Sequence, residues 1–68
     1  MRVESLEKWA EVAAKLSEKG YSLYMMQYGT DRPEGFHCWF MLHETPGVEI
    51  VTYSAEVRDA IYKYKPEA

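Results

Sequence analysis

The chain has 68 residues, which predicts a single domain over residues 1–68 and excludes a second. Its formal net charge is −3, from 8 Lys and Arg against 11 Asp and Glu, which excludes the basic surface that a duplex nucleic acid partner requires. A single cysteine excludes an internal disulfide, and the lack of a secretion signal or of an apolar run of about 18 residues predicts a cytoplasmic protein with no membrane partner.

Residues 5–19 have the apolar spacing of an amphipathic helix. Five apolar residues fall on one arc at a period of 3.6: Leu6, Trp9, Val12, Ala13 and Leu16. Ser5 suits the N-cap because its hydroxyl can accept a hydrogen bond from the first turn, and Gly20 suits the left-handed stop at the other end.

Residues 21–28 and 36–43 are rich in aromatic side chains and predict two strands, joined by a hairpin loop over residues 29–35 that contains Gly and Pro. A third strand, residues 48–53, follows Thr45-Pro46-Gly47. Pro and then Gly at the two central positions favour a type II turn there, because Gly accepts the positive φ that the second position needs.

Residues 54–64 predict a second helix, with Ser54 as its N-cap and Glu56 in its first turn. Its apolar stripe consists of Val57, Ala60, Ile61 and Tyr64. The order of elements predicts an α+β fold of the type αβββα. In this fold a three-stranded antiparallel sheet in hairpin order has both helices packed on one face.

A turn centred on Pro46-Gly47 assigns the side chains of the sheet to two faces. The face expected to form the core carries Cys38, Phe40, Leu42, Val51 and Tyr53. The opposite face then carries His37, Trp39, Met41, His43, Ile50 and Thr52. The register of residues 21–28 stays open, and the favoured pairing adds Leu23 and Met25 to this second face.

The residues that carry chemistry do not converge on a site. His37 and His43 lie six positions apart on one strand, or about 20 Å, so they cannot share a metal ion. Cys38 faces away from His37, which excludes a thiol activated by that imidazole. Glu44 and Glu49 are expected opposite each other beside a turn, where no cleft would desolvate them. We therefore expect no catalytic, cofactor-binding or metal-binding residue and no cofactor.

The second face predicts the function, because two helices usually cover only one side of a three-stranded sheet and an apolar face left open normally binds a partner. The alternative is that the helices straddle both faces of the sheet. The expected interaction surface consists of Leu23, Met25, His37, Trp39, Met41, His43 and Ile50. We expect a non-catalytic interaction module whose partner is another protein, either a second copy in a homodimer or the other subunits of a larger complex. Alternatives are single-stranded nucleic acid or a small ligand on the aromatic face, and a small enzyme with a site at the joint of a dimer.

Overall fold

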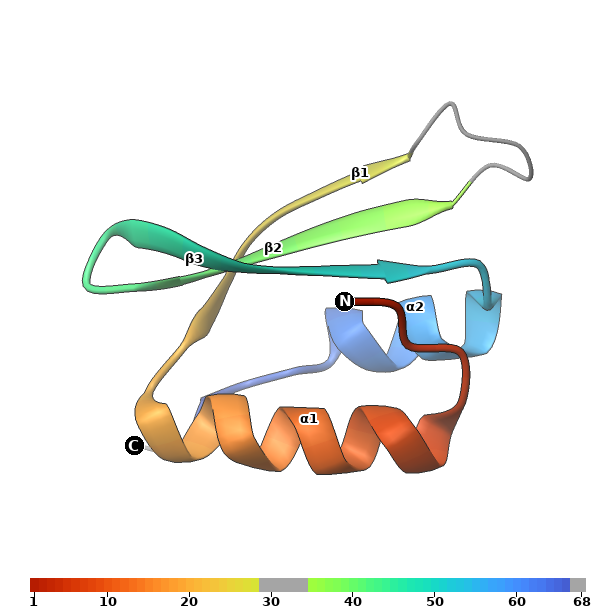
Figure 1. Ribbon diagram of the computed structural model, residues 1–68, viewed down its shortest axis with the longest axis horizontal. Helices are drawn as coiled ribbons and strands as arrows, with labels where there is room; N and C mark the ends of the chain where they lie inside the picture. Colours follow the sequence, from red (N-terminus) through yellow and green to blue (C-terminus); the bar gives the residue numbers. More distant parts are fainter. Residues whose placement is uncertain (29–34, 67–68) are drawn as a thin grey trace.

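The structure is a computed structural model that describes residues 1–28 and 35–66. Its elements are, in chain order, α1 (Leu6–Lys19), β1 (Ser22–Tyr28), β2 (Phe36–Leu42), β3 (Thr45–Thr52) and α2 (Ala55–Tyr62). The strands form one antiparallel sheet in the order β1-β2-β3, and both helices lie on the same side of it (Figure 1). This confirms the predicted αβββα fold. Of the predicted hairpin loop, residues 29–34 lie outside the described residues.

The ends of α1 lie where the sequence predicts them. The Ser5 hydroxyl accepts a hydrogen bond from the Lys8 N–H at 3.1 Å, and Gly20 ends the helix in the left-handed conformation with φ 87°. The predicted apolar arc is wrong at its first member, because Leu6 is 43% exposed. The helix buries only Trp9, Val12 and Leu16.

The predicted turn at Pro46-Gly47 is wrong, because β2 and β3 are joined at His43 and Glu44. Both turn residues have left-handed φ values, 52° and 65°. Two-residue turns of this kind match the right-handed twist of the strands they join, whereas a type II turn would splay the strands apart. The twist of the sheet therefore prevails over the local Pro-Gly signal.

Because the turn lies at His43-Glu44 and not at Pro46-Gly47, each side chain of β3 lies on the opposite face of the sheet from the one predicted. Cys38 lies opposite Ile50, and Phe36 lies opposite Thr52. Ile50 and Thr52, which were predicted on the open side, are completely buried in the core with Cys38. A change of register by an odd number of residues moves every side chain of a strand to the other face, so Val51 now faces away from the helices.

The register of β1 was predicted correctly for Met25, which lies opposite Trp39. An irregularity before Met25 leaves Tyr24 without a partner residue in β2. Leu23 consequently lies opposite Phe40 and packs against the core, so its predicted place on the open face is wrong.

The N-terminal segment adds a short parallel neighbour to the outer edge of β3. Arg2 forms a parallel bridge with Val51. The N–H of Val3 donates to the Val51 carbonyl at 2.9 Å, and the N–H of Val51 donates to the Met1 carbonyl at 2.7 Å. The Val3 side chain is completely buried, which ties the segment to the core, a feature that the sequence pattern does not reveal.

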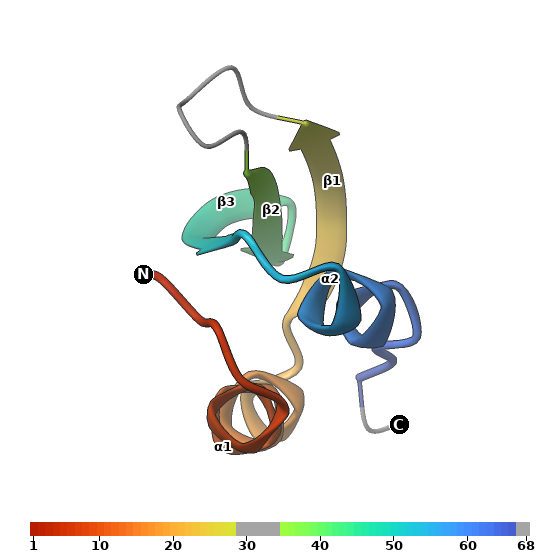
Figure 2. The same cartoon turned by 90° about the vertical axis from the view of Figure 1, so that its right-hand side faces the viewer.

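Both helices lie beneath the strands in Figure 2, and the core residues fill the space between these helices and the sheet. Its aromatic centre joins α1, β2 and the residues that follow α2. The ring of Phe40 lies 6.1 Å from that of Trp9 and meets the ring of Tyr64 edge-on at 5.3 Å. The Tyr64 hydroxyl donates to the Tyr21 carbonyl at 2.6 Å, so Tyr64 faces inward as predicted.

Candidate interaction surface

The side of the sheet that faces away from the helices is the candidate site, and we call it the open face. Because Cys38 and Phe40 point into the core, the alternating residues of β2 point to the opposite side. The same alternation in β1 and β3, read from the observed pairing, completes the surface. The open face consists of Met25, Gln27, His37, Trp39, Met41, Glu49, Val51 and Tyr53.

An apolar strip crosses the middle of the open face. Met25 of β1 lies directly opposite Trp39 of β2 and is 38% exposed. Met41 follows Trp39 along β2, and Val51 of β3 lies opposite the neighbouring His37. An antiparallel sheet with one face toward solvent normally carries polar residues there, so this strip is unusual for a surface without a partner.

A polar pair lies beside the strip. His37 Nδ1 lies 3.0 Å from Glu49 Oε2, and these side chains are 23% and 33% exposed. The two residues are diagonal neighbours on adjacent strands, since Trp39 is the direct partner of Glu49. The predicted pairing of Glu49 with Glu44 is wrong, because Glu44 lies in the turn. The open face thus combines an apolar centre with a hydrogen-bonded polar flank.

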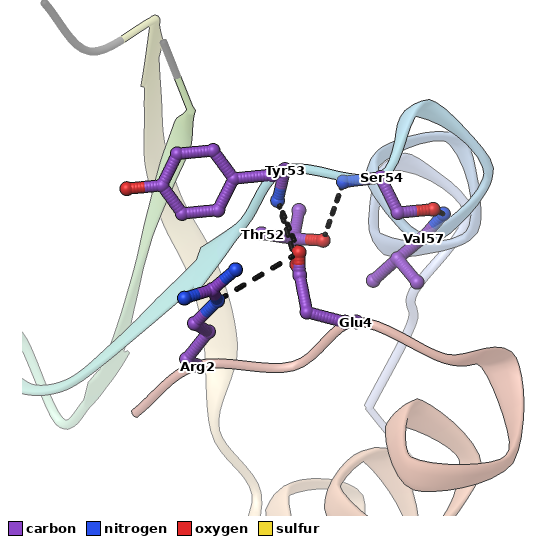
Figure 3. A network of polar contacts seen from close by, with 6 residues as sticks. All are labelled: Arg2, Glu4, Thr52, Tyr53, Ser54 and Val57. Carbon is purple, nitrogen blue, oxygen red and sulfur yellow. Dashed lines mark hydrogen bonds and ion pairs between the residues drawn. The ribbon is translucent and has the colours of Figure 1, made fainter. Parts of the chain in front are cut away.

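A stack of side chains forms the rim of the open face beside β3. The Arg2 guanidinium carbon lies 4.7 Å from the centre of the Tyr53 ring, and a Cβ added at Gly35 would lie 3.0 Å from that ring. The carboxylate of Glu4 accepts the Tyr53 N–H, with both oxygens at 2.9 Å, and lies 3.9 Å from Arg2 Nε. Figure 3 shows how these contacts connect the N-terminal segment to the end of β3.

The thiol and imidazole groups do not form a reactive site. Cys38 is completely buried, and this burial raises the pKa of its thiol to about 11, so the thiol stays protonated at neutral pH. His43 is exposed in the turn. Within residues 1–28 and 35–66, no group of three or more His, Cys, Asp or Glu side chains is placed to hold a metal ion.

The structure brings together four of the seven predicted surface residues: Met25, His37, Trp39 and Met41. Two belong to the core side instead, Leu23 and Ile50, and His43 lies in the turn beyond the end of β2. The residues that sequence reasoning missed are Gln27, Glu49, Val51 and Tyr53. A signal for three of them was present, because the charge of Glu49 indicates that its own side of β3, shared with Val51 and Tyr53, faces water.

Comparison of the chain with protein-family models, with curated proteins and with solved structures found no match. Neither helix of the described part of the chain is long and apolar enough to cross a membrane.

Proposed function

We propose that the protein is a non-catalytic interaction module that binds a protein partner through its open face, most simply a second copy of itself. The observation that carries this proposal is the apolar strip of Met25, Trp39, Met41 and Val51 on a sheet side that neither helix covers. Burying such a strip removes apolar surface from water, which is the main favourable term in most protein association. A chain of 68 residues buries only about 60% of the surface that its unfolded form exposes, so self-association would also stabilise the fold.

The dimensions of the face predict a modest affinity. Three strands of seven or eight residues at about 4.8 Å spacing, with the short N-terminal segment beside β3, make a plane of roughly 400 Å². A standard interface buries about 800 Å² on each partner. The open face alone therefore supports association that depends on protein concentration and not a permanent dimer.

We place this module in the cytoplasm and expect neither duplex nucleic acid nor a membrane as its partner. The net charge is −3, and β1, β2 and β3 contain no Lys or Arg. Binding to nucleic acid, including the stacking of single-stranded bases on aromatic side chains, needs cations near the phosphates. A protein partner needs only an apolar surface of matching shape.

The test is sedimentation equilibrium or light scattering over a concentration series, applied to the wild type and two variants. Met41→Glu places a charge in the apolar strip, whereas Leu6→Glu places one at an exposed apolar position on α1, away from the open face. We expect the average mass of the wild type to rise above 8.0 kDa, Met41→Glu to lower it at each concentration, and Leu6→Glu to leave it unchanged. An equal mass for wild type and Met41→Glu would overturn the proposal.

Circular dichroism and the cooperativity of urea unfolding show whether each variant is folded. Because Met41 is only partly buried and lies outside the core, we expect Met41→Glu to keep the wild-type spectrum. A Met41→Glu variant that is folded but has a lower average mass in solution would show that the interface is lost and the fold is not.

A further inference from the structure

The two edges of the sheet are protected very differently. On the outer edge of β3, both backbone groups of Val51 bond to the N-terminal segment, and the Tyr53 N–H bonds to Glu4. On the outer edge of β1, no helix, strand or terminal segment among the described residues runs beside residues 25–28, and Figure 2 shows this end of β1 rising beyond both helices. No charged side chain occurs in Ser22–Tyr28, although edge strands are commonly protected by charges.

The bonds of Val51 determine which backbone groups of β2 face β3. In an antiparallel pair, residues alternate between exchanging both backbone hydrogen bonds with their partner and exchanging none. The N–H and the carbonyl of Val51 both point to the N-terminal segment, so Val51 forms no backbone hydrogen bond with its partner His37. Its neighbour Ile50 therefore forms both backbone hydrogen bonds with Cys38, its partner in β2.

The same alternation carried across β2 identifies the outward groups of β1. Since Cys38 directs its backbone groups toward β3, His37 directs its own toward β1 and bonds to Gln27. Met26 and Tyr28 flank Gln27, so their N–H and carbonyl groups point away from the sheet. These outward groups are spaced to receive a further antiparallel strand.

We propose that this edge pairs with β1 of a second copy around a two-fold axis at Gln27. In this register Met26 of each chain lies opposite Tyr28 of the other, so all the outward groups of residues 26–28 are used in two hydrogen-bonded pairs. The unpaired Tyr24 limits the regular part of the strand to residues 25–28.

The second copy is favoured over other strands for two reasons. The pairing brings no like charges together, because β1 has none. In addition, the β3 edge already carries the N-terminal segment, so pairing at β1 stops at two copies and does not continue into a fibre. The pairing leaves both open faces on the same side of the joined sheet and so does not depend on the function proposed for the open face.

Amide hydrogen exchange tests whether a second copy covers the outward N–H groups of β1. We expect exchange at the Met26 amide to slow by about tenfold when nine in ten chains are paired. The Gln27 amide is the internal control, because it bonds to His37 within each chain and is protected at every concentration. A Met26 exchange rate that does not change up to about 1 mM protein would overturn the inference.

Charge exchange at Gln27 tests the register, because the two copies of this residue would lie opposite each other with Cβ atoms about 5 Å apart. The variants Gln27→Lys and Gln27→Glu are each made in the Met41→Glu background, where open-face pairing is removed. We expect each variant alone to lose the remaining self-association and an equal mixture of the two to recover it. Tyr24→Lys is the matched control, because Tyr24 is 55% exposed and lies outside the paired run, so it keeps the association.

The outcomes separate this inference from the open-face proposal. The edge pairing would be overturned if either single Gln27 variant associated as strongly as its Met41→Glu parent. It would also be overturned if the mixture of the two variants failed to recover self-association. A monomeric Met41→Glu parent would also overturn it, while leaving the open-face proposal intact. Recovery of self-association by the Gln27→Lys and Gln27→Glu mixture, in a protein whose mass Met41→Glu does not change, would support the edge pairing and refute the open-face proposal.

Discussion

A double substitution in the turn between β2 and β3 is expected to raise stability if the hairpin turns at His43-Glu44, as observed, and to lower it if the hairpin turns at Pro46-Gly47. His43 and Glu44 adopt left-handed φ values of 52° and 65°. A residue with a Cβ adopts this conformation at a cost of roughly 1–2 kcal/mol, whereas Asn tolerates it and Gly has no penalty. The double variant His43→Asn, Glu44→Gly removes most of that cost but gives the unfolded chain more freedom at the new glycine, by roughly 0.5–1 kcal/mol. We expect a net gain of about 1 kcal/mol.

Urea and thermal unfolding measure this difference. For a domain of this size, about 1 kcal/mol raises Tm by roughly 4–8 °C. If the hairpin turned instead at Pro46-Gly47, positions 43 and 44 would lie in strands, where Asn and Gly would lower stability by about 1 kcal/mol. A loss of stability in the His43→Asn, Glu44→Gly variant would therefore refute the observed register, and with it the composition of the open face.

Two glycines provide matched controls. Gly47 is not in the left-handed region, and a Cβ added there would meet the Tyr21 ring at 3.5 Å, an ordinary contact. We expect Gly47→Ala to change stability by less than about 0.5 kcal/mol, whereas a type II turn at this position would make it cost about 1 kcal/mol or more. Gly20 has φ 87° at the end of α1, so Gly20→Ala is expected to cost about 1 kcal/mol.

Two further predictions concern Glu4 and Cys38. Glu4→Gln weakens the charge-assisted bonds to the Tyr53 N–H and is expected to lower the free energy of unfolding in urea by about 1 kcal/mol. Glu44→Gln, at an exposed position in the turn, is expected to change it little, and equal losses would contradict this. Because burial raises the pKa of the Cys38 thiol from 9.0 to about 11, the unfolded chain ionises first, and stability falls by roughly 2–3 kcal/mol as pH rises from about 9 to about 11. Cys38→Ala is expected to reduce this decline but not abolish it, because burial also raises the pKa of Tyr64; an unchanged pH profile would show that the Cys38 pKa is not raised.

The sequence predicts the helices and the order of the strands because their signals are local. Ser5 and Gly20 mark the ends of α1 within one turn of the helix, and apolar spacing identifies the side that packs. Ser54 does the same for α2, where its hydroxyl accepts the Val57 N–H at 3.2 Å. Short connections then favour neighbouring antiparallel strands, which is the order observed.

The pairing of β3 could not be predicted as securely, because the strand has apolar residues on both sides. Ile50 and Val51 are adjacent, so hydrophobic alternation is satisfied almost equally in two registers that differ by an odd number of residues. The local Pro46-Gly47 signal then favoured the wrong one. Only Glu49 distinguishes the two from sequence, since the wrong register places its carboxylate on the core side.

The N-terminal contact was not predictable for a different reason. Three residues are too few to show a period, and a parallel bridge between Arg2 and Val51 joins positions 49 residues apart. The burial of Val3 depends on the sheet and helices already being in place. Such a contact is a consequence of the tertiary structure and has no local sequence signature.

The hypothesis of an open apolar face does not depend on the register of β3, because β2 determines which side is open. Cys38 and Phe40 face the helices, so Trp39 and Met41 lie on the other side whichever way β3 is paired. The two proposed contacts also have compatible symmetry. The axis of the edge pairing is perpendicular to the sheet and that of a face-to-face pairing is parallel to the sheet plane, so the two contacts together close at four copies when these axes intersect. With intersecting axes, a chain of 8.0 kDa that used both contacts would form a sandwich of four chains, and disrupting either contact alone would leave pairs.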